Sequence, residues 1–425
     1  MEGQTLQKPT RILSGAIRRG GAWCALVLLA ALLAGCGAAT AQHAGTTATA
    51  TWQIPTTAPV TPTATVAPPI KGAALNWSHT TLPSDFGMLF HWSDMKFAGS
   101  DGATAYACGG QAATNQPQML VTHDGGHTWG TLRTLTGVSE CDEITVDSIN
   151  PSIAIVHGAF SQNIAASLLT TNGGSTWTPT PNTASLSIQA LATVSGRAYA
   201  IIAHSNSSGQ VMQDVEQSND GLHSWQPIDG DIAQAEHPQV GGNYLSNLWV
   251  NPATGALLVS VQLNGGFDLW QSNDDGQHWT QLKPPSPDTA FGRFVVQQPF
   301  AAQPWHICYL ANLSLIAVMC SSDGGATWVS EPQFWQYTQN TDFISIIGLP
   351  GDGSLLLTAR NEFYRLPAHS TQWQDIGGTS PASGGTYFAP DAGGSGGTLW
   401  QTPIESDGAG MADPPNMIYT AIYPY

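Results

Sequence analysis

Charged side chains are scarce in this 425-residue sequence, at 10% of residues, and basic ones are the scarcest. Twelve Lys and Arg stand against 29 Asp and Glu, which gives a formal net charge of −17. Four of the basic residues and one acidic residue precede Cys36, so the remainder has 8 basic and 28 acidic side chains, a net charge of −20. Such a surface repels phosphate backbones and anionic lipid headgroups. This charge balance argues against nucleic-acid binding.

Cofactor signatures are also missing. The sequence has no P-loop, no dinucleotide fingerprint within a βαβ unit and no nucleophile elbow. His123 and His127 are four residues apart, but they flank Asp124 in a turn motif and not on one helix face, where paired His ligands usually lie. We therefore expect no cofactor and no metal site in this protein.

Long hydrophobic runs are likewise few, and one lies near the N-terminus. Arg11, Arg18 and Arg19 precede an uncharged run over 22–34, which is shorter than the roughly 20 residues of a membrane span and fits a signal peptide. The run ends in Leu33-Ala34-Gly35-Cys36, which resembles the lipobox of bacterial lipoproteins. The resemblance implies a signal peptide over 1–35, lipid on Cys36, and an exported protein anchored on the extracytoplasmic side of the bacterial cell membrane. The alternative is an ordinary signal cut after residues 39–41.

Residues 36–72 contain mainly Ala, Thr and Pro, with almost no charge and no periodicity. Proline at this density favours an extended chain that buries no core. We expect a disordered tether between the lipidated cysteine and a folded part that begins at residue 73.

What the sequence does have is one short phrase that occurs five times: Ser or Thr, any residue, Asp or Asn, Gly within two residues, then Trp. Strand-like runs flank each copy, so each is expected to turn an antiparallel hairpin. The acidic or amide oxygen can accept backbone N–H groups, Gly supplies positive φ, and the Trp ring anchors the turn. These residue types account for a structural role. The pairs are Asp124 and Trp129, Asn172 and Trp177, Asp220 and Trp225, Asp274 and Trp279, and Asp323 and Trp328.

Two further strand-like runs precede the second and fourth hairpins, at 143–147 and 152–156, then at 248–250 and 256–261. Four strands in each unit of 45 to 54 residues indicate an all-β propeller. The repeated phrases resemble the Asp-box, or bacterial neuraminidase repeat, of sialidase-like propellers. Counting from Trp77 to Trp373 predicts seven four-stranded antiparallel blades over residues 73–425. The Trp77 strand then completes a C-terminal set of three strands, and six or eight blades are the alternatives.

Four cysteines remain in the predicted folded part. An even number in an exported protein favours disulfides. Cys308 and Cys320 flank a turn within one blade, whereas Cys108 and Cys141 lie in neighbouring blades. We expect these two pairings, with four buried thiols as the alternative.

The resemblance to sialidases implies three convergent Arg, a Tyr–Glu pair and an Asp acid. The folded part has only five Arg and lacks the Arg-Ile-Pro phrase of that family, so we expect no Arg triad. Related hydrolases use two carboxylates. Candidates on innermost strands are Asp94, Glu143, Asp147 and Asp342, although ordinary hydrogen-bonded acids would look the same.

The lipoprotein outline also resembles the photosystem II assembly factor family, whose members hold protein partners. The basic Arg patch of that family is not matched by five scattered Arg. We expect a monomeric, non-enzymatic binding or assembly module for a protein or a polysaccharide, with a glycoside hydrolase as the alternative. Four tryptophans could stack on sugars or pack between blades: Trp92, Trp249, Trp270 and Trp305.

Overall fold

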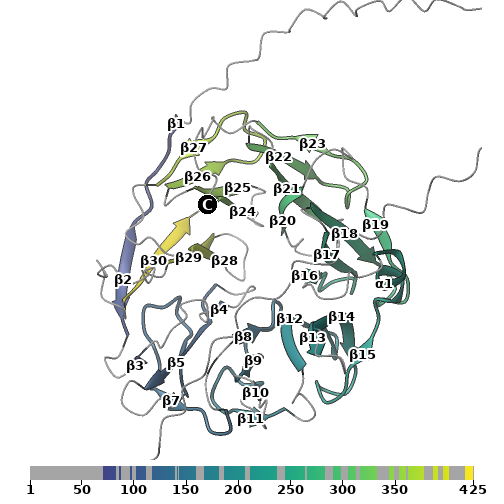
Figure 1. Ribbon diagram of the computed structural model, residues 1–425. Coiled ribbons are helices and arrows are strands. Elements are labelled where there is room, and N and C mark those ends of the chain that lie inside the picture. Colours follow the sequence, from purple (N-terminus) through teal and green to yellow (C-terminus); the bar gives the residue numbers. More distant parts are fainter. Residues whose placement is uncertain are drawn as a thin grey trace, which may run out of the picture. The chain divides into compact units, whose positions relative to one another are not determined.

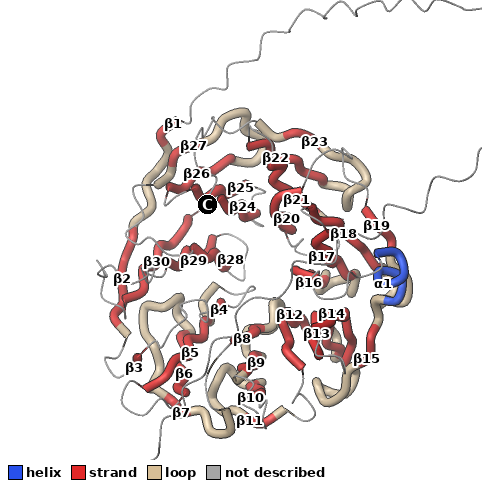
Figure 2. The backbone as a smooth tube through the Cα atoms, viewed as in Figure 1, coloured by secondary structure: helices blue, strands red, loops and turns tan. Residues whose placement is uncertain are grey.

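Short β-strands and one helix make up the described part of the computed structural model (Figures 1 and 2). Every described residue belongs to the unit formed by residues 64–425. The expected signal peptide, Cys36 and the tether up to residue 69 therefore lie outside the described residues. These are 70–82, 86–87, 96–97, 102–111, 117–138, 141, 143–158, 167–180, 186–205, 211–236, 245–263, 266–282, 291–297, 305–312, 316–332, 344–348, 354–359, 362–377, 386–390, 396–401 and 417–424.

The first four sheets that these residues form are antiparallel and follow chain order. Sheet 1 consists of β3 (Phe86–Gly87), β5 (Ala105–Gln111), β6 (Pro117–Thr122) and β7 (Arg133–Thr134), with β4 (Lys96–Phe97) also on β5. Sheet 2 consists of β8 (Glu143–Val146), β9 (Ala154–His157), β10 (Ser167–Thr170) and β11 (Thr178–Pro179). Sheet 3 consists of β12 (Leu186–Val194), β13 (Arg197–Ser205), β14 (Val211–Ser218) and β15 (Gln226–Pro227). Sheet 4 consists of β16 (Leu245–Val250), β17 (Leu257–Leu263), β18 (Gly266–Ser272) and β19 (Thr280–Leu282).

Three more sheets complete the described strands. Sheet 5 consists of β20 (Phe291–Gln297), β21 (His306–Asn312), β22 (Ile316–Ser321) and β23 (Val329–Ser330). Sheet 6 consists of β24 (Ile344–Gly348), β25 (Leu355–Ala359), β26 (Glu362–Leu366) and β27 (Gln374–Asp375), with β1 (Ile70–Lys71) parallel to β27. Sheet 7 consists of β28 (Thr386–Pro390), β29 (Gly396–Gln401), β30 (Met417–Pro424) and β2 (Trp77–Thr81).

Each sheet buries apolar side chains against the next one. Separate core clusters join sheets 1 and 2, 2 and 3, 3 and 4, 4 and 5, 5 and 6, and 6 and 7. Sheets 7 and 1 also meet, because a Cβ added to Gly125 would lie 3.4 Å from Thr398 Oγ1. Strands buried on both faces explain the apolar runs of the sequence, such as β9, whose four residues are all buried. Consecutive four-stranded antiparallel sheets packed in this way form a β-propeller.

The two ends of the propeller chain meet in one sheet. β2 pairs with β30, with Trp77 opposite Ala421, and Trp77 packs against Phe363 of sheet 6 with ring centroids 5.4 Å apart. The strand β1 lies inside the segment expected to be a tether up to residue 72. Its ordered position has a local reason, because the amide of Gly72 donates to the carbonyl of Asp375.

The helix α1 (Gly230–Glu236) follows β15, and the sequence patterns did not reveal it. It buries Ile232 in the cluster between sheets 3 and 4. Asp231 Oδ2 accepts the backbone amide of Trp279 at 2.9 Å, so the helix ties two sheets together. No helix among the described residues is both long and apolar enough to span a membrane.

Two disulfides link the four cysteines as the spacing indicates. Cys308 and Cys320 lie opposite each other on β21 and β22, with Cα atoms 4.1 Å apart. Cys108 of sheet 1 bonds to Cys141, which precedes β8 of sheet 2, with Cα atoms 6.1 Å apart. The second bond joins neighbouring sheets.

Candidate functional site

The five Asp-box turns share one hydrogen-bond network. In the first box the Thr122 hydroxyl donates to Asp124 Oδ1 at 2.8 Å and accepts from the amide of Gly126 at 3.0 Å. Asp124 Oδ1 also accepts the amide of Thr128 at 2.9 Å. The same bonds recur in the other four boxes, centred on Asn172, Asp220, Asp274 and Asp323. Each acidic or amide side chain is therefore engaged in shaping its own turn.

Hydrogen bonding keeps the box carboxylates ionised. The His278 ring lowers the pKa of Asp274 to about 2, and the Thr327 hydroxyl lowers that of Asp323 to about 2. Carboxyls with such pKa values hold no proton at neutral pH, so they cannot serve there as general acids. The box tryptophans anchor the sheets, as where Trp177 packs edge-on against Tyr106 of the preceding sheet.

Two of the four predicted carboxylate candidates are described. Glu143 on β8 is half-buried and accepts a hydrogen bond from Ser187 at 3.2 Å. Asp147 is fully buried, its Oδ1 accepts the amides of Ile149 and Asn150, and burial raises its pKa. Asp94 and Asp342 lie outside the described residues.

Local hydrogen bonds account for both described candidates. Glu143 accepts from Ser187, and Asp147 accepts two amides that lie within three residues of it. Since Asp147 also closes its own turn, it is better explained as a structural residue.

The described arginine side chains are dispersed over three sheets. Arg133 on β7 donates to the carbonyl of Ser175, and Arg365 on β26 donates to the hydroxyl of Ser354. Arg197 on β13 forms an ion pair with Asp275. These three do not converge on one site, while the side chains of Arg293 and Arg360 lie outside the described residues. Two tryptophans considered for sugar stacking, Trp270 and Trp305, are buried at 6% and 2% exposure.

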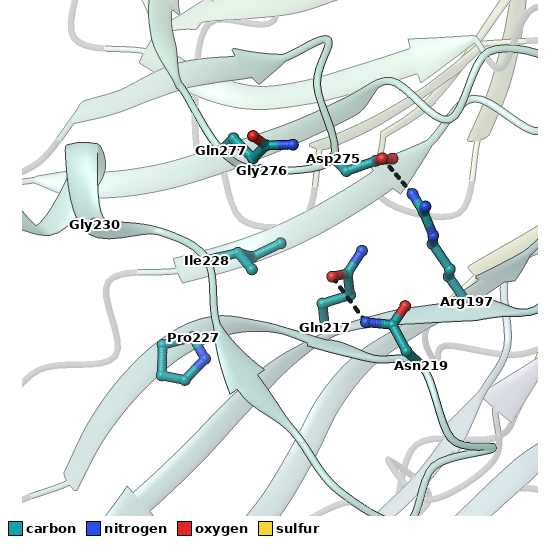
Figure 3. A pocket seen from close by; sticks show the side chains of 9 residues that line it. All are labelled: Arg197, Gln217, Asn219, Pro227, Ile228, Gly230, Asp275, Gly276 and Gln277. Atoms are coloured by element: carbon teal, nitrogen blue, oxygen red, sulfur yellow. Dashed lines mark hydrogen bonds and ion pairs between the residues drawn. The ribbon is translucent and has the colours of Figure 1, made fainter.

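A polar pocket of about 450 Å³ lies between sheets 3 and 4 (Figure 3). Its wall on one side comes from sheet 3 and the turn after β15. On the other side it is closed by the fourth Asp-box. It is lined by Arg197, Gln217, Asn219, Pro227, Ile228, Gly230, Asp275, Gly276 and Gln277.

Asp275 organises this pocket because it departs from the repeat. Most boxes have Gly after the central acid or amide, whereas Asp275 occupies that position with φ of 62°. Its carboxylate pairs with Arg197 and accepts the Tyr199 hydroxyl at 3.0 Å. Gln217 donates to the same hydroxyl at 3.3 Å. The wall is therefore positioned by a connected set of hydrogen bonds.

The pocket offers neutral amides more than charge. Asn219 and Gln277 are exposed, and Gln217 is half-buried beside them. Amide groups both donate and accept, which suits peptide bonds or sugar hydroxyls. The sequence patterns do not single out Arg197. The available signal was the Asp in place of Gly at position 275.

The sequence matches no protein-family model and no curated protein. Solved structures are similar in fold. YCF48 bound to D1 peptide aligns with a TM-score of 0.50 and 14% identity, over 85% of this chain and 99% of that one. YCF48 from Cyanidioschyzon merolae aligns at 0.50 and 13%, over 81% and 98%. An oligogalacturonate lyase from Vibrio parahaemolyticus aligns at 0.51 and 9%, over 83% and 98%. Similar chains thus include a peptide-bound protein and a lyase, and the likeness shows the propeller fold.

Proposed function

We propose that this protein is a non-enzymatic binding module whose ligand is a segment of another exported protein. The observation that carries the proposal is the amide-lined pocket between sheets 3 and 4. Three amide side chains and the Arg197–Asp275 pair present donors and acceptors from a rigid wall. An extended peptide needs such groups for its backbone N–H and C=O.

The fold comparison supports a protein ligand. A chain of nearly the same extent, YCF48, has been solved bound to a D1 peptide. The net charge adds a preference, because the chain from Cys36 on has a formal net charge of −20, which attracts basic segments and repels acidic ones. The same charge disfavours oligogalacturonate, a polyanion, as a ligand.

Hydrolysis is less well supported. Each described candidate carboxylate accepts a local hydrogen bond, and Asp147 closes a turn. The described arginines are each engaged with their own sheet or its neighbour. A glycoside hydrolase therefore has no assembled site among the described residues.

We further propose that the seven sheets are seven blades of one ring, and that the module is held at the outer side of a bacterial membrane by lipid on Cys36. The lipobox phrase and the Ala/Thr/Pro-rich segment support this placement. Labelled palmitate incorporated into the wild-type protein and absent from Cys36→Ser is the expected result. Equal labelling of both would refute the anchor.

Binding is tested with the full chain on arrays of 12-residue peptides that range from basic to acidic, and on a glycan array. The test variant is Asn219→Ala with Gln277→Ala, because both side chains are exposed and line the pocket. Its matched control is Gln226→Ala, an exposed amide on β15 outside the lining. Two lost hydrogen bonds, about 0.5 to 1.5 kcal/mol each, predict an affinity loss of roughly 5- to 150-fold.

Retention of basic peptides that is weakened in the double variant and not in the control supports the proposal. Retention of glycans alone would replace the protein ligand by a polysaccharide. Turnover of sialosides or plant polysaccharides that disappears in Glu143→Gln would replace binding by hydrolysis.

A further inference from the structure

One face of sheet 3 carries a polar cluster at the margin of an apolar core. Ala198, Ala200 and Ile202 of β13 lie on this face and pack against residues of sheet 2. The polar residues of the same face are His204, Asp214, Glu216 and Asp229. They combine three carboxyls with one imidazole.

Strand register brings these four residues together. His204 lies opposite Met212 on β14, and side chains alternate, so Asp214 and Glu216 share the face of Met212. The amide of Ile228 donates to the carbonyl of Val215, which continues the β14–β15 pairing by one residue. Asp229 therefore comes opposite Asp214 on that face.

The distances between these groups are short. His204 Nε2 lies 3.2 Å from Asp214 Oδ2. One ligand atom from each of His204, Asp214 and Glu216 lies within 4.8 Å of the others. Burial increases from the rim to the floor: the His204 and Asp214 side chains are 28% and 21% exposed, whereas Glu216 and Asp229 are 7% and 3% exposed.

The cluster has more negative charge than its own residues can balance. Three carboxyls, those of Asp214, Glu216 and Asp229, share this face with the single imidazole of His204. Buried Asp229 Oδ2 and His204 Nδ1 make no hydrogen bond among the described residues. Leaving a buried carboxylate oxygen unpaired is costly, and a cation bound beside Asp229 Oδ2 would relieve that cost.

We propose that His204, Asp214 and Glu216 bind one divalent transition-metal cation, preferentially Zn²⁺, with Asp229 beside it on the buried side. Imidazole and carboxylate donors suit zinc better than calcium or magnesium, which prefer all-oxygen ligands. Zinc–ligand bonds of about 2.0 to 2.1 Å place two tetrahedral ligands about 3.3 Å apart. The His204–Asp214 separation of 3.2 Å agrees with that spacing.

Two other groupings fit a metal less well. His306 lies near Cys308 and Cys320, but these sulfurs are joined in a disulfide and are not thiolates. His278 and Asp274 form an exposed pair at 2.7 Å with two ligands instead of three. That pair provides a matched control, because it has the same chemistry without the third ligand or the burial.

The test is isothermal titration of the metal-free full chain with Zn²⁺, alongside His204→Ala, Glu216→Gln and the control His278→Ala. We expect one zinc per wild-type chain and per control chain, and an affinity at least about tenfold weaker in the other two variants. Circular dichroism checks that each variant is folded. Calcium should compete at least about tenfold more weakly than zinc.

Anomalous diffraction at the zinc edge gives a second readout that does not depend on a variant. A peak between His204 Nε2 and the Asp214 carboxylate is the expected result. Absence of stoichiometric binding, equal affinity in His204→Ala, or a peak elsewhere would overturn the proposal. These results leave peptide binding at the pocket untouched, because the pocket residues are different.

Discussion

Replacing Gly276 by Ala should destabilise the propeller more than replacing Gly221, although both are Asp-box glycines with positive φ. Their φ values are 83° and 76°. A Cβ at Gly276 would lie 2.5 Å from Ile228 Cδ1 and 2.9 Å from Ile228 Cβ. At Gly221 the nearest heavy atom would be His223 Nδ1 at 3.7 Å, an ordinary contact.

The two variants differ because both have a conformational cost, whereas only Gly276→Ala also has a steric cost. Placing a side chain at positive φ costs about 1 to 2 kcal/mol at either position. Overpacking adds about 1 to 3 kcal/mol at Gly276 only. Ile228 cannot move away freely, since its carbonyl accepts Trp279 Nε1 at 2.7 Å. We expect a free energy of unfolding lower by about 2 to 5 kcal/mol for Gly276→Ala and by about 1 to 2 kcal/mol for Gly221→Ala.

Urea unfolding with the disulfides intact measures both values. The double variant Gly276→Ala with Ile228→Ala should lose less than the sum of its two single variants, because it removes Ile228 Cδ1 and Cγ1, two of the three atoms in conflict. Equal losses for the two single variants, or an additive double variant, would refute the steric explanation. Leu222 already indicates that positive φ alone is tolerated, because it is buried at the second glycine position of the third box with φ of 72°.

Three further outcomes are expected. His157 accepts the amide of Ile188 on Nε2, and burial lowers the pKa of His157 to about 4. The free energy of unfolding should therefore fall by roughly 3 kcal/mol as the pH drops from 6.5 to about 4. Urea titrations at both pH values should show this loss in the wild type, and an equal loss in His157→Gln would contradict it. Asp275→Gly should leave the free energy of unfolding unchanged or raise it, while weakening peptide binding; a large loss of stability would exclude a binding role for the strained Asp. Removing the disulfide Cys108–Cys141, which closes 33 residues, should cost about 4 kcal/mol, and removing Cys308–Cys320, which closes 12, should cost about 3 kcal/mol. Denaturation of the paired Ser variants measures both values, and a reversed order would refute the chain-entropy account.

The propeller could be predicted because its signal is local. Each Asp-box closes its bonds within five residues, as between Thr122 and Gly126, so the sequence window contains the whole turn. Strands such as β9 are buried on both faces, which leaves recognisable apolar runs. The short helix α1 escaped because seven residues carry too little periodicity, and its stability comes from Ile232 and from the contact of Asp231 with sheet 4.

The pocket and the polar cluster could not be predicted, because both depend on contacts between distant residues. Arg197 and Asp275 are 78 residues apart and meet only when sheets 3 and 4 pack. His204 and Asp214 are closer in the chain, but their contact requires the exact hairpin register of β13 and β14. A shift of one residue would turn the carboxylates to the opposite face.

In a repeat protein of this kind, the positions that break the repeated pattern carry the functional information, because the hairpin structure explains the repeated residues. The fourth box has Asp275 where glycine would relieve a backbone strain of about 1 to 3 kcal/mol. The ion pair with Arg197 is too exposed to offset that strain reliably, with side-chain exposures of 45% and 37%. The hydrogen bond from the Tyr199 hydroxyl offsets part of the strain, so the net contribution of Asp275 to stability is small and does not by itself explain this residue. A role in holding the Arg197 and Gln217 side chains in place around a ligand explains Asp275. The pocket, and not the acids of the boxes, is therefore the site to test first.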